Sequence, residues 1–148
     1  MKKTAILIMI VIFIGSCVEE EVKEKSPLEG AWELVYGSWS AYDETFPAQI
    51  RGGGTKLWSK EHFAFINRFI IDEDTTDTFY DLYGWGTYEL NGDKYKEQIK
   101  LHSADGYHGT TARMLLEIRN DTLIQKWPAD ENWMLPEEYN YEKWIRLE

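Results

Sequence analysis

The chain has 148 residues, of which 16 are basic and 26 are acidic, so its formal net charge is −10 at neutral pH. This acidity disfavours nucleic acids and anionic membrane faces as partners, and we expect no nucleic-acid partner. The length suffices for one domain. Aromatic residues make up 15% of the chain, which suits a β-rich domain with bulky interior side chains.

The N-terminus has the pattern of a secretory signal. Two lysines at positions 2 and 3 form a short basic region, an apolar run covers residues 5–14, and the small residues Gly15 and Ser16 follow. The run has 10 residues, whereas a membrane-spanning helix needs about 20. We therefore expect residues 1–16 to be a signal peptide that is cleaved from the mature protein.

Cys17, the only cysteine in the chain, follows directly. The string Ile14-Gly15-Ser16-Cys17 resembles the bacterial lipobox. This resemblance implies attachment of diacylglycerol to Cys17, cleavage before it, and acylation of the freed amine, for example with palmitate. Two or more acyl chains hold a protein stably at a membrane. The alternative is a plain signal peptide that ends near a cysteine.

A polar and highly charged segment follows Cys17 and ends in Pro27. This composition is typical of a flexible tether, so the lipidated cysteine and the tether together occupy residues 17–27. The acidic residues beside the cysteine resemble the surface-export signals of some Bacteroidota lipoproteins, and an ordinary solvated linker explains them equally well. We expect a lipid-anchored protein of the cell envelope at the outer membrane, with surface exposure left open.

The remaining residues, 28–148, form the folded domain, and their early segments alternate with a period of two. The predicted inward faces carry Trp32, Leu34 and Tyr36 in a first strand, and Phe63, Phe65, Asn67 and Phe69 in a later one. Residues 37–54 read as a long loop that could form a lid, with a flexible turn at residues 51–54. A short helix is compatible with residues 42–49 or 136–139.

The clearest β-hairpin lies between residues 84 and 101. Asn91-Gly92 is the strongest short hairpin signal, because both central residues of a type I′ turn need a positive φ. A two-residue turn there places Glu97 opposite Gly86 and Tyr88 opposite Tyr95. The predicted inward face carries Tyr88, Leu90, Tyr95, Glu97, Ile99 and Leu101, and the outward face carries Thr87, Glu89, Lys94, Lys96, Gln98 and Lys100.

A second hairpin turns at Asn120-Asp121, and a last strand covers residues 141–147. The predicted inward residues of the second hairpin are Ala112, Met114, Leu116, Ile118, Leu123, Gln125 and Trp127. In total we expect about eight strands, joined mostly by hairpins. This pattern favours an all-β fold, an antiparallel up-and-down β-barrel, with room for one small ligand.

Three segments carry a resemblance to a known family. Gly30-Ala31-Trp32 resembles the G-x-W motif of lipocalins, residues 86–97 resemble the central hairpin of small lipocalin-like proteins of bacterial envelopes, and Trp144-Ile145-Arg146 resembles their closing strand. The resemblance covers residues 28–147. It implies a lipocalin-like (calycin) barrel in which Arg146 lies over Trp32, and a cup that binds a small hydrophobic or amphipathic molecule.

Glu97 is the candidate site residue with the widest range of possible roles, because it is a carboxylate on the predicted inward face. An inward carboxylate is costly unless it is paired. It could bind a ligand cation or hydroxyl, or act as a general base; the alternative is a structural hydrogen bond to Tyr88, Tyr95 or an interior arginine. The predicted ligand contacts are the polar residues Glu97, Tyr88, Tyr95, Asn67 and Gln125 and the apolar residues Phe63, Phe65, Met114 and Trp127.

Metal and cofactor signals are weak. His102 and His108 flank a predicted loop without a third ligand. An acidic loop with Asp72, Asp74, Asp77 and Asp81 lacks the spacing of a Ca²⁺ loop. We therefore expect neither a metal nor a cofactor, and no catalytic motif decides whether the protein is an enzyme.

The predicted function is the binding or transport of a small hydrophobic or amphipathic ligand at the cell envelope. The first alternative is a protein-interaction module, such as an inhibitor or envelope assembly factor, that uses loops 37–54 and 128–140. Exposed tryptophans at Trp39, Trp133 and Trp144 would suit it, since tryptophan anchors interfaces. The second alternative is a barrel enzyme that uses Glu97.

Overall fold

The computed structural model describes residues 25–40, 43–73 and 76–147. The expected signal peptide, Cys17 and most of the tether lie outside these residues, so those expectations remain predictions. Within the described part of the chain, no helix has the length and apolar character needed to cross a membrane.

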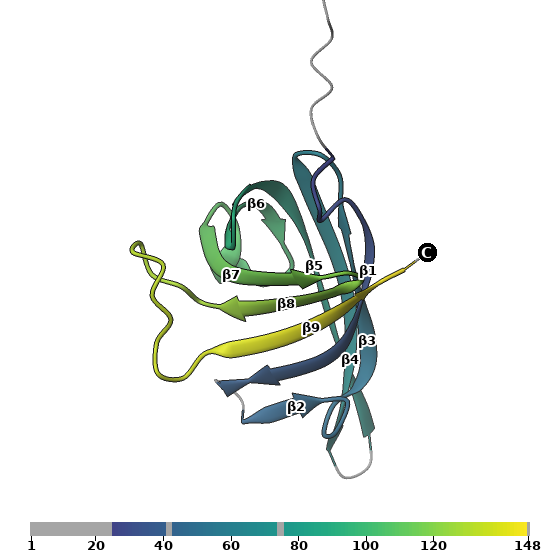
Figure 1. Ribbon diagram of the computed structural model, residues 1–148. Coiled ribbons are helices and arrows are strands. Elements are labelled where there is room, and N and C mark those ends of the chain that lie inside the picture. The colour runs from purple at the N-terminus through teal and green to yellow at the C-terminus, as the bar shows by residue number, and fades with distance from the viewer. Residues whose placement is uncertain (1–24, 41–42, 74–75, 148) are drawn as a thin grey trace, which may run out of the picture.

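The described residues form one antiparallel sheet that closes on itself (Figure 1). Its strands are β1 (Gly30–Trp39), β2 (Glu44–Phe46), β3 (Arg51–Trp58), β4 (His62–Glu73), β5 (Thr76–Asn91), β6 (Lys94–His102), β7 (Thr111–Arg119), β8 (Thr122–Trp127) and β9 (Asn140–Arg146). β1 pairs with both β3 and β9, so that β1 and β3–β9 close an eight-stranded barrel, and the short β2 adds to the far end of β1. The predicted all-β, up-and-down, lipocalin-like barrel is confirmed.

The alternating strand directions give the barrel two different ends. At the turn end, tight connections at residues 58–62, 91–94 and 119–122 lie beside the point where the chain enters β1. The connections between β1 and β3, β6 and β7, and β8 and β9 lie at the opposite end, which we call the loop end. The largest fully buried side chains gather at the turn end: Leu28, Trp32, Phe63, Tyr95, Leu123 and Trp144.

The predicted contact between Arg146 and Trp32 closes the turn end. The guanidinium carbon of Arg146 lies 4.1 Å from the ring centroid of Trp32, a cation–π contact. The same guanidinium donates hydrogen bonds to the carbonyl oxygens of Glu29 (2.7 Å) and Pro27 (2.6 Å). Gly30 has a φ of +133°, and a Cβ there would lie 3.1 Å from Arg146 Nη1. The glycine of the motif therefore makes room for the arginine.

The register predicted for the β5–β6 hairpin is wrong by two residues. Asn91 pairs with Lys94, so Gly92 and Asp93 form the turn. Of these two turn residues only Gly92 has a positive φ, +64°, which indicates a type II′ turn, because the expected type I′ turn needs a positive φ at both. Tyr88 therefore opposes Glu97, and Gly86 opposes Ile99. A shift of two residues does not by itself change the face on which a side chain lies.

The β7–β8 turn was predicted correctly. Arg119 pairs with Thr122, which leaves Asn120 and Asp121 as the two-residue turn. Asn120 has a φ of +52°, and asparagine tolerates this left-handed conformation.

Two predicted inward residues, Tyr36 and Leu101, point outward and are each 39% exposed. The register shifts between Leu34 and Tyr36 in β1 and again opposite Trp85, where Leu101 pairs. Each bulge adds one residue to its strand, and one extra residue reverses the alternation beyond it.

The segments predicted as loops contain more strand than expected. β1 continues to Trp39, β2 pairs with it, and β3 begins at Arg51, so residues 37–54 are not a long free loop. The predicted turn at residues 51–54 lies inside β3, and the described residues of 42–49 and of 136–139 contain no helix. The predicted acidic loop is a hairpin ladder in which Asp72 pairs with Asp77, while Asp74 lies outside the described residues.

Candidate functional site

The barrel interior contains a set of buried polar side chains. They are Lys56, Glu97, Gln125, Asn140 and Glu142, and we call them the interior polar cluster. Glu97 and Gln125 are predicted as interior residues from the sequence, whereas Lys56, Asn140 and Glu142 are not. Lys56 alternates with Gly54 and Trp58 in β3, and Glu142 alternates with Trp144 in β9, so the same period-two pattern was the signal that could have found them.

Glu97 is paired on the inside of the barrel. Lys56 Nζ forms an ion pair with Glu97 Oε1, and the Tyr95 hydroxyl donates a hydrogen bond of 2.8 Å to the same oxygen. Trp58 Nε1 in turn donates to the Tyr95 hydroxyl at 2.8 Å. Lys56 and Glu97 are only 4% and 3% exposed, so this chain of contacts ties β3 to β6 in a dry environment.

The contacts of Glu97 are those of a structural residue rather than of a ligand-binding or catalytic one. The expected hydrogen bond from Tyr95 is present, the interior cation is a lysine rather than an arginine, and Tyr88 donates its hydroxyl to the Ser59 carbonyl instead (2.8 Å). Burial, and then the charge of Glu97, raise the pKa of Tyr95 well above 10.0, so Tyr95 stays a donor. Two titratable partners within hydrogen-bond reach would also suit an acid–base site, but the depth of burial favours the structural role.

Aromatic rings surround the ammonium group of Lys56. Its Nζ lies 4.9 Å from the ring centroid of Trp58, 5.0 Å from Phe63, 5.6 Å from Tyr95 and 6.0 Å from Phe65. Cation–π attraction is strongest at sites removed from water. These rings therefore offset part of the cost of burying the Lys56–Glu97 pair.

Glu142 forms a second polar centre. Its Oε1 accepts a hydrogen bond from Trp39 Nε1 (3.0 Å), and its Oε2 accepts from Gln125 Nε2 (3.1 Å) and Trp144 Nε1 (3.2 Å). Burial raises the pKa of Glu142, while the bond from Trp39 and the charge of Lys56 act in the opposite direction. The carboxyl is therefore held by three donors but is harder to ionise than an exposed one.

Three buried polar atoms of the described residues have no hydrogen-bond partner. They are Asn67 Oδ1, Gln125 Oε1 and Trp127 Nε1. All three belong to residues that the sequence analysis selected as ligand contacts. A buried polar atom without a partner costs about 1–3 kcal/mol, so each of these atoms favours any bound group that completes its hydrogen bonding.

The nine predicted ligand contacts fall into two groups. Around the Lys56–Glu97 pair lie Phe63, Phe65, Tyr88, Tyr95 and Glu97, with Met114 paired in register to Tyr95. The other group consists of Asn67, Gln125 and Trp127, which carry the unpartnered atoms. These three lie on different strands: Asn67 pairs with Gly54 of β3, Gln125 bonds Glu142 of β9, and Trp127 is the last residue of β8, at the loop end.

The histidines do not form a metal site. No group of three potential metal ligands occurs among the residues that the structure describes. His102 packs between the rings of Phe65 and Tyr107, at centroid distances of 5.4 and 4.8 Å, and its Nδ1 accepts a hydrogen bond from the Ala104 amide. Burial lowers the pKa of His102, and His108 is exposed in the β6–β7 connection.

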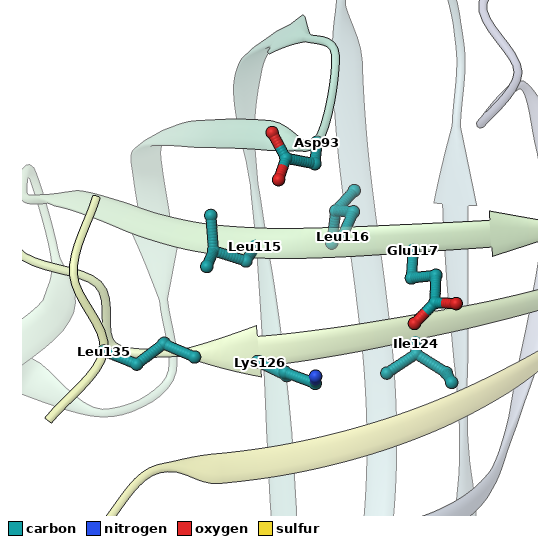
Figure 2. A pocket seen from close by; sticks show the side chains of 7 residues that line it. All are labelled: Asp93, Leu115, Leu116, Glu117, Ile124, Lys126 and Leu135. Carbon is teal, nitrogen blue, oxygen red and sulfur yellow. The ribbon is translucent and has the colours of Figure 1, made fainter. Parts of the chain in front are cut away.

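A groove of about 310 Å³ lies on the outside of the barrel, not beside Glu97 (Figure 2). Its lining comprises residues of β7 and β8, one residue of the β5–β6 turn and one residue of the β8–β9 connection: Asp93, Leu115, Leu116, Glu117, Ile124, Lys126 and Leu135. Figure 2 shows Leu135 reaching towards β8 from that connection. The groove is therefore separate from the interior polar cluster.

The tryptophans proposed as exposed interface anchors are mostly inside the protein. Trp144 is 2% exposed, and Trp39 is half-buried. Both donate to Glu142, which explains why they turn inward. Trp133 is half-buried in the β8–β9 connection, with Lys94 Nζ 5.8 Å from its ring centroid. The prediction of three exposed tryptophans was wrong.

A solved structure is similar to this chain, but no family model or curated protein matches it. Among solved structures, the chain is similar to a lipocalin-like protein from Bacteroides uniformis, with 12% sequence identity and a TM-score of 0.47 over 81% of this chain and 98% of that one. The lipocalin-like barrel of this protein rests on its own closed strand order.

The interior ion pair predicts a specific stability pattern. Glu97→Gln leaves the Lys56 charge buried without a counter-charge, so we expect the free energy of unfolding, measured in urea, to fall by about 3–5 kcal/mol. Lys56→Met should cost a similar amount, and the double variant should recover much of the loss. The exposed pair Lys96–Glu89 is the control, and Glu89→Gln should cost about 1 kcal/mol or less. A Glu97→Gln effect no larger than the control would contradict this assignment.

The raised pKa of Glu142 predicts that the stability of the fold depends on pH. Its pKa in the folded protein lies above the ordinary 4.5, so the folded chain binds this proton more tightly than the unfolded chain. The resulting stabilisation is complete below pH 4.5 and is lost as the pH rises through the raised pKa. We expect the free energy of unfolding of Glu142→Gln, measured in urea at several pH values, not to show this fall with rising pH. The exposed control Glu138→Gln should show the same fall as the wild type. If the free energy of unfolding changed with pH in the same way in the wild type and in Glu142→Gln, Glu142 would not be the source of the pH dependence.

Proposed function

We propose that this protein is a lipid-anchored envelope lipoprotein whose barrel binds one small amphipathic molecule. The lipocalin-like barrel is compatible with ligand binding in general, although fold does not decide function. The observation that carries the proposal is the set of unpartnered interior atoms on Asn67, Gln125 and Trp127. A ligand with a hydroxyl or amide group offers both the donors and the acceptor that these atoms lack.

The polarity of the interior favours a neutral head group. Lys56 and Glu97 already neutralise each other, and Glu142 already accepts three hydrogen bonds. An anionic ligand would therefore meet no free cation in this cluster, and a cation would find only Glu142, whose burial raises its pKa and opposes ionisation; burying an unpaired charge is costly. Two acceptor oxygens and one N–H donor instead suit an alcohol, an amide or a similar neutral group.

The gradient of burial favours the loop end as the binding region. Side chains at the turn end are fully buried and close-packed. At the loop end, Trp39 and Trp127 are only partly buried, and the ring of Trp39 packs edge-on against Phe69 (5.5 Å), which also contacts Phe46 (5.9 Å). Phe46 and Phe69 are buried, so the partly buried rings of Trp39 and Trp127 supply the apolar surface for a ligand tail at this end.

The outer groove favours a second candidate function. Its apolar floor, from Leu115, Ile124 and Leu135, is bordered by the charged groups of Asp93, Glu117 and Lys126. An apolar centre with a polar rim is the usual composition of a protein-binding patch. The β8–β9 connection, one of the two segments proposed for partner binding, contributes Leu135 to it. A protein-interaction module that uses this groove is therefore the alternative.

The anchor is tested by the mass of the mature N-terminus. We expect protein purified from bacterial membranes to begin at Cys17 and to carry a diacylglycerol and an additional acyl chain. Cys17→Ser should abolish the modification and release the protein from membranes, because no acyl chain remains to hold it there. A mature chain with an unmodified Cys17 thiol would remove the anchor from the proposal.

Ligand binding is tested with a neutral amphipath of known structure. We expect octan-1-ol to quench tryptophan fluorescence at lower concentration than octane or octanoate does. Asn67→Leu removes one acceptor at similar volume and should weaken octan-1-ol binding by about five- to tenfold, the value of one hydrogen bond. The same variant should be no less stable than wild type without ligand, because it removes an unpartnered atom.

The exposed Asn132→Leu is the matched control and should bind octan-1-ol as the wild type does. Native mass spectrometry of protein from its own host should also show a bound small molecule. Failure of both measurements, with no preference for the alcohol and no co-purified molecule, would exclude the proposed ligand site.

A further inference from the structure

A group of large apolar side chains lies on the outside of the barrel. Its members are Leu57, Ile66, Phe79, Tyr83, Trp85 and Leu101, which are 39% to 71% exposed; we call them the outer patch. They come from four consecutive strands, β3 to β6, which lie next to one another in the barrel wall (Figure 1). Isolated exposed apolar residues are ordinary, but a contiguous group of this size marks a binding surface.

The strand register makes the outer patch continuous. Leu57 pairs with Ala64, Ala64 with Trp85, and Trp85 with Leu101, so one row crosses all four strands. Ile66 pairs with Tyr83 in the adjacent row. Directly paired residues have Cβ atoms about 4.5–5.5 Å apart. The bulge opposite Trp85 turns Leu101 outward and thereby extends the row.

The charged groups within the outer patch neutralise each other. Arg68 donates two hydrogen bonds of 2.6 Å to the carboxylate of Asp81. The guanidinium carbon of Arg68 also lies 5.4 Å from the ring centroid of Phe79. By contrast, Arg113, Glu117, Lys126 and Lys143 occupy outward positions on β7, β8 and β9. The outer patch thus combines exposed apolar side chains with one internally paired cation and anion.

We infer that the outer patch docks onto the surface of the lipid bilayer to which the protein is anchored; this inference rests on the proposed lipid anchor. Leu57 pairs with Ala31, so the patch begins next to the point where the chain enters the barrel. Eleven residue steps separate Cys17 from Leu28, a span of at most about 40 Å. An anchor of that length keeps the patch close to the bilayer and raises its effective concentration there.

The composition and charge of the surface fit a bilayer better than a second copy of the chain. Tryptophan and tyrosine, accompanied by aliphatic side chains, are enriched where proteins meet the membrane–water interface. The chain has a net charge of −10, which repels another copy but not a zwitterionic bilayer. Phe79 lies towards the loop end and Leu57 towards the turn end, so a docked barrel lies on its side with its loop end near the membrane.

The test places a fluorescent probe on the outer patch of the mature lipidated protein. Because Cys17 is the only native cysteine, its lipidation leaves Ile66→Cys as the sole thiol for a nitrobenzoxadiazole maleimide. The labelled protein is added to preformed vesicles of phosphatidylcholine and phosphatidylethanolamine. We expect a blue shift of the emission and a several-fold fall in quenching by iodide. Both should persist at high salt, because an apolar contact is not screened.

Lys143→Cys is the matched control on the opposite side of the barrel and should remain fully quenched. Leu57→Cys provides a second position in the outer patch and should behave like Ile66→Cys. Two labels per chain would show that Cys17 carries no lipid and would overturn the proposed anchor. One label with equal quenching at Ile66 and Lys143 would overturn docking alone. In a separate sample of unlabelled Ile66→Cys protein under air oxidation, a disulfide-linked dimer would assign the patch to a second copy and would also overturn docking.

Discussion

Closure of the barrel between its first and last strands is the constraint on which the other features depend. β1 pairs with β9, and Arg146 lies over Trp32 where the two strands meet. Without this closure, β1 and β9 would be sheet edges with unpaired backbone groups. With it, side chains that are far apart in the sequence share one interior, and every polar group among them must find its partner there.

The shared interior has two regions, which differ in whether their buried polar atoms all have hydrogen-bond partners. Near the Lys56–Glu97 pair, aromatic rings and a tyrosine hydroxyl complete the contacts of both charges. Around Gln125, the amide nitrogen is bonded to Glu142 whereas the amide oxygen has no partner. The first arrangement stabilises the fold, and the second leaves binding capacity unused. This contrast explains why the proposal for ligand binding rests on Asn67, Gln125 and Trp127 rather than on Glu97.

The outside of the barrel is as asymmetric as the inside. A group of exposed apolar side chains crosses β3 to β6, and a smaller groove with both apolar and charged side chains lies over β7 and β8. An acidic protein held near a membrane by a short tether would otherwise be free to rotate. An apolar side gives such a protein a preferred orientation, and it would bring the less tightly packed loop end close to the source of any membrane-derived ligand.

Local sequence pattern was sufficient for the strands of the two predicted hairpins, for most inward positions and for one of the two turns, but it missed β2 and the start of β3. Alternation identified Tyr95, Glu97 and Gln125 as interior residues, because side-chain direction in a strand depends only on the neighbouring backbone. The same rule failed at Tyr36 and Leu101, since a bulge is set by how two strands fit together and not by either strand alone.

The partners of the interior residues were decided by tertiary structure alone. Lys56 lies 41 positions from Glu97, and Trp39 lies 103 positions from Glu142. No periodicity within a strand relates residues so far apart, because their contact follows from the order in which eight strands close. The sequence by itself therefore determined most of the inward-facing side chains, and only the closed barrel decided which of them meet and which are left without a partner.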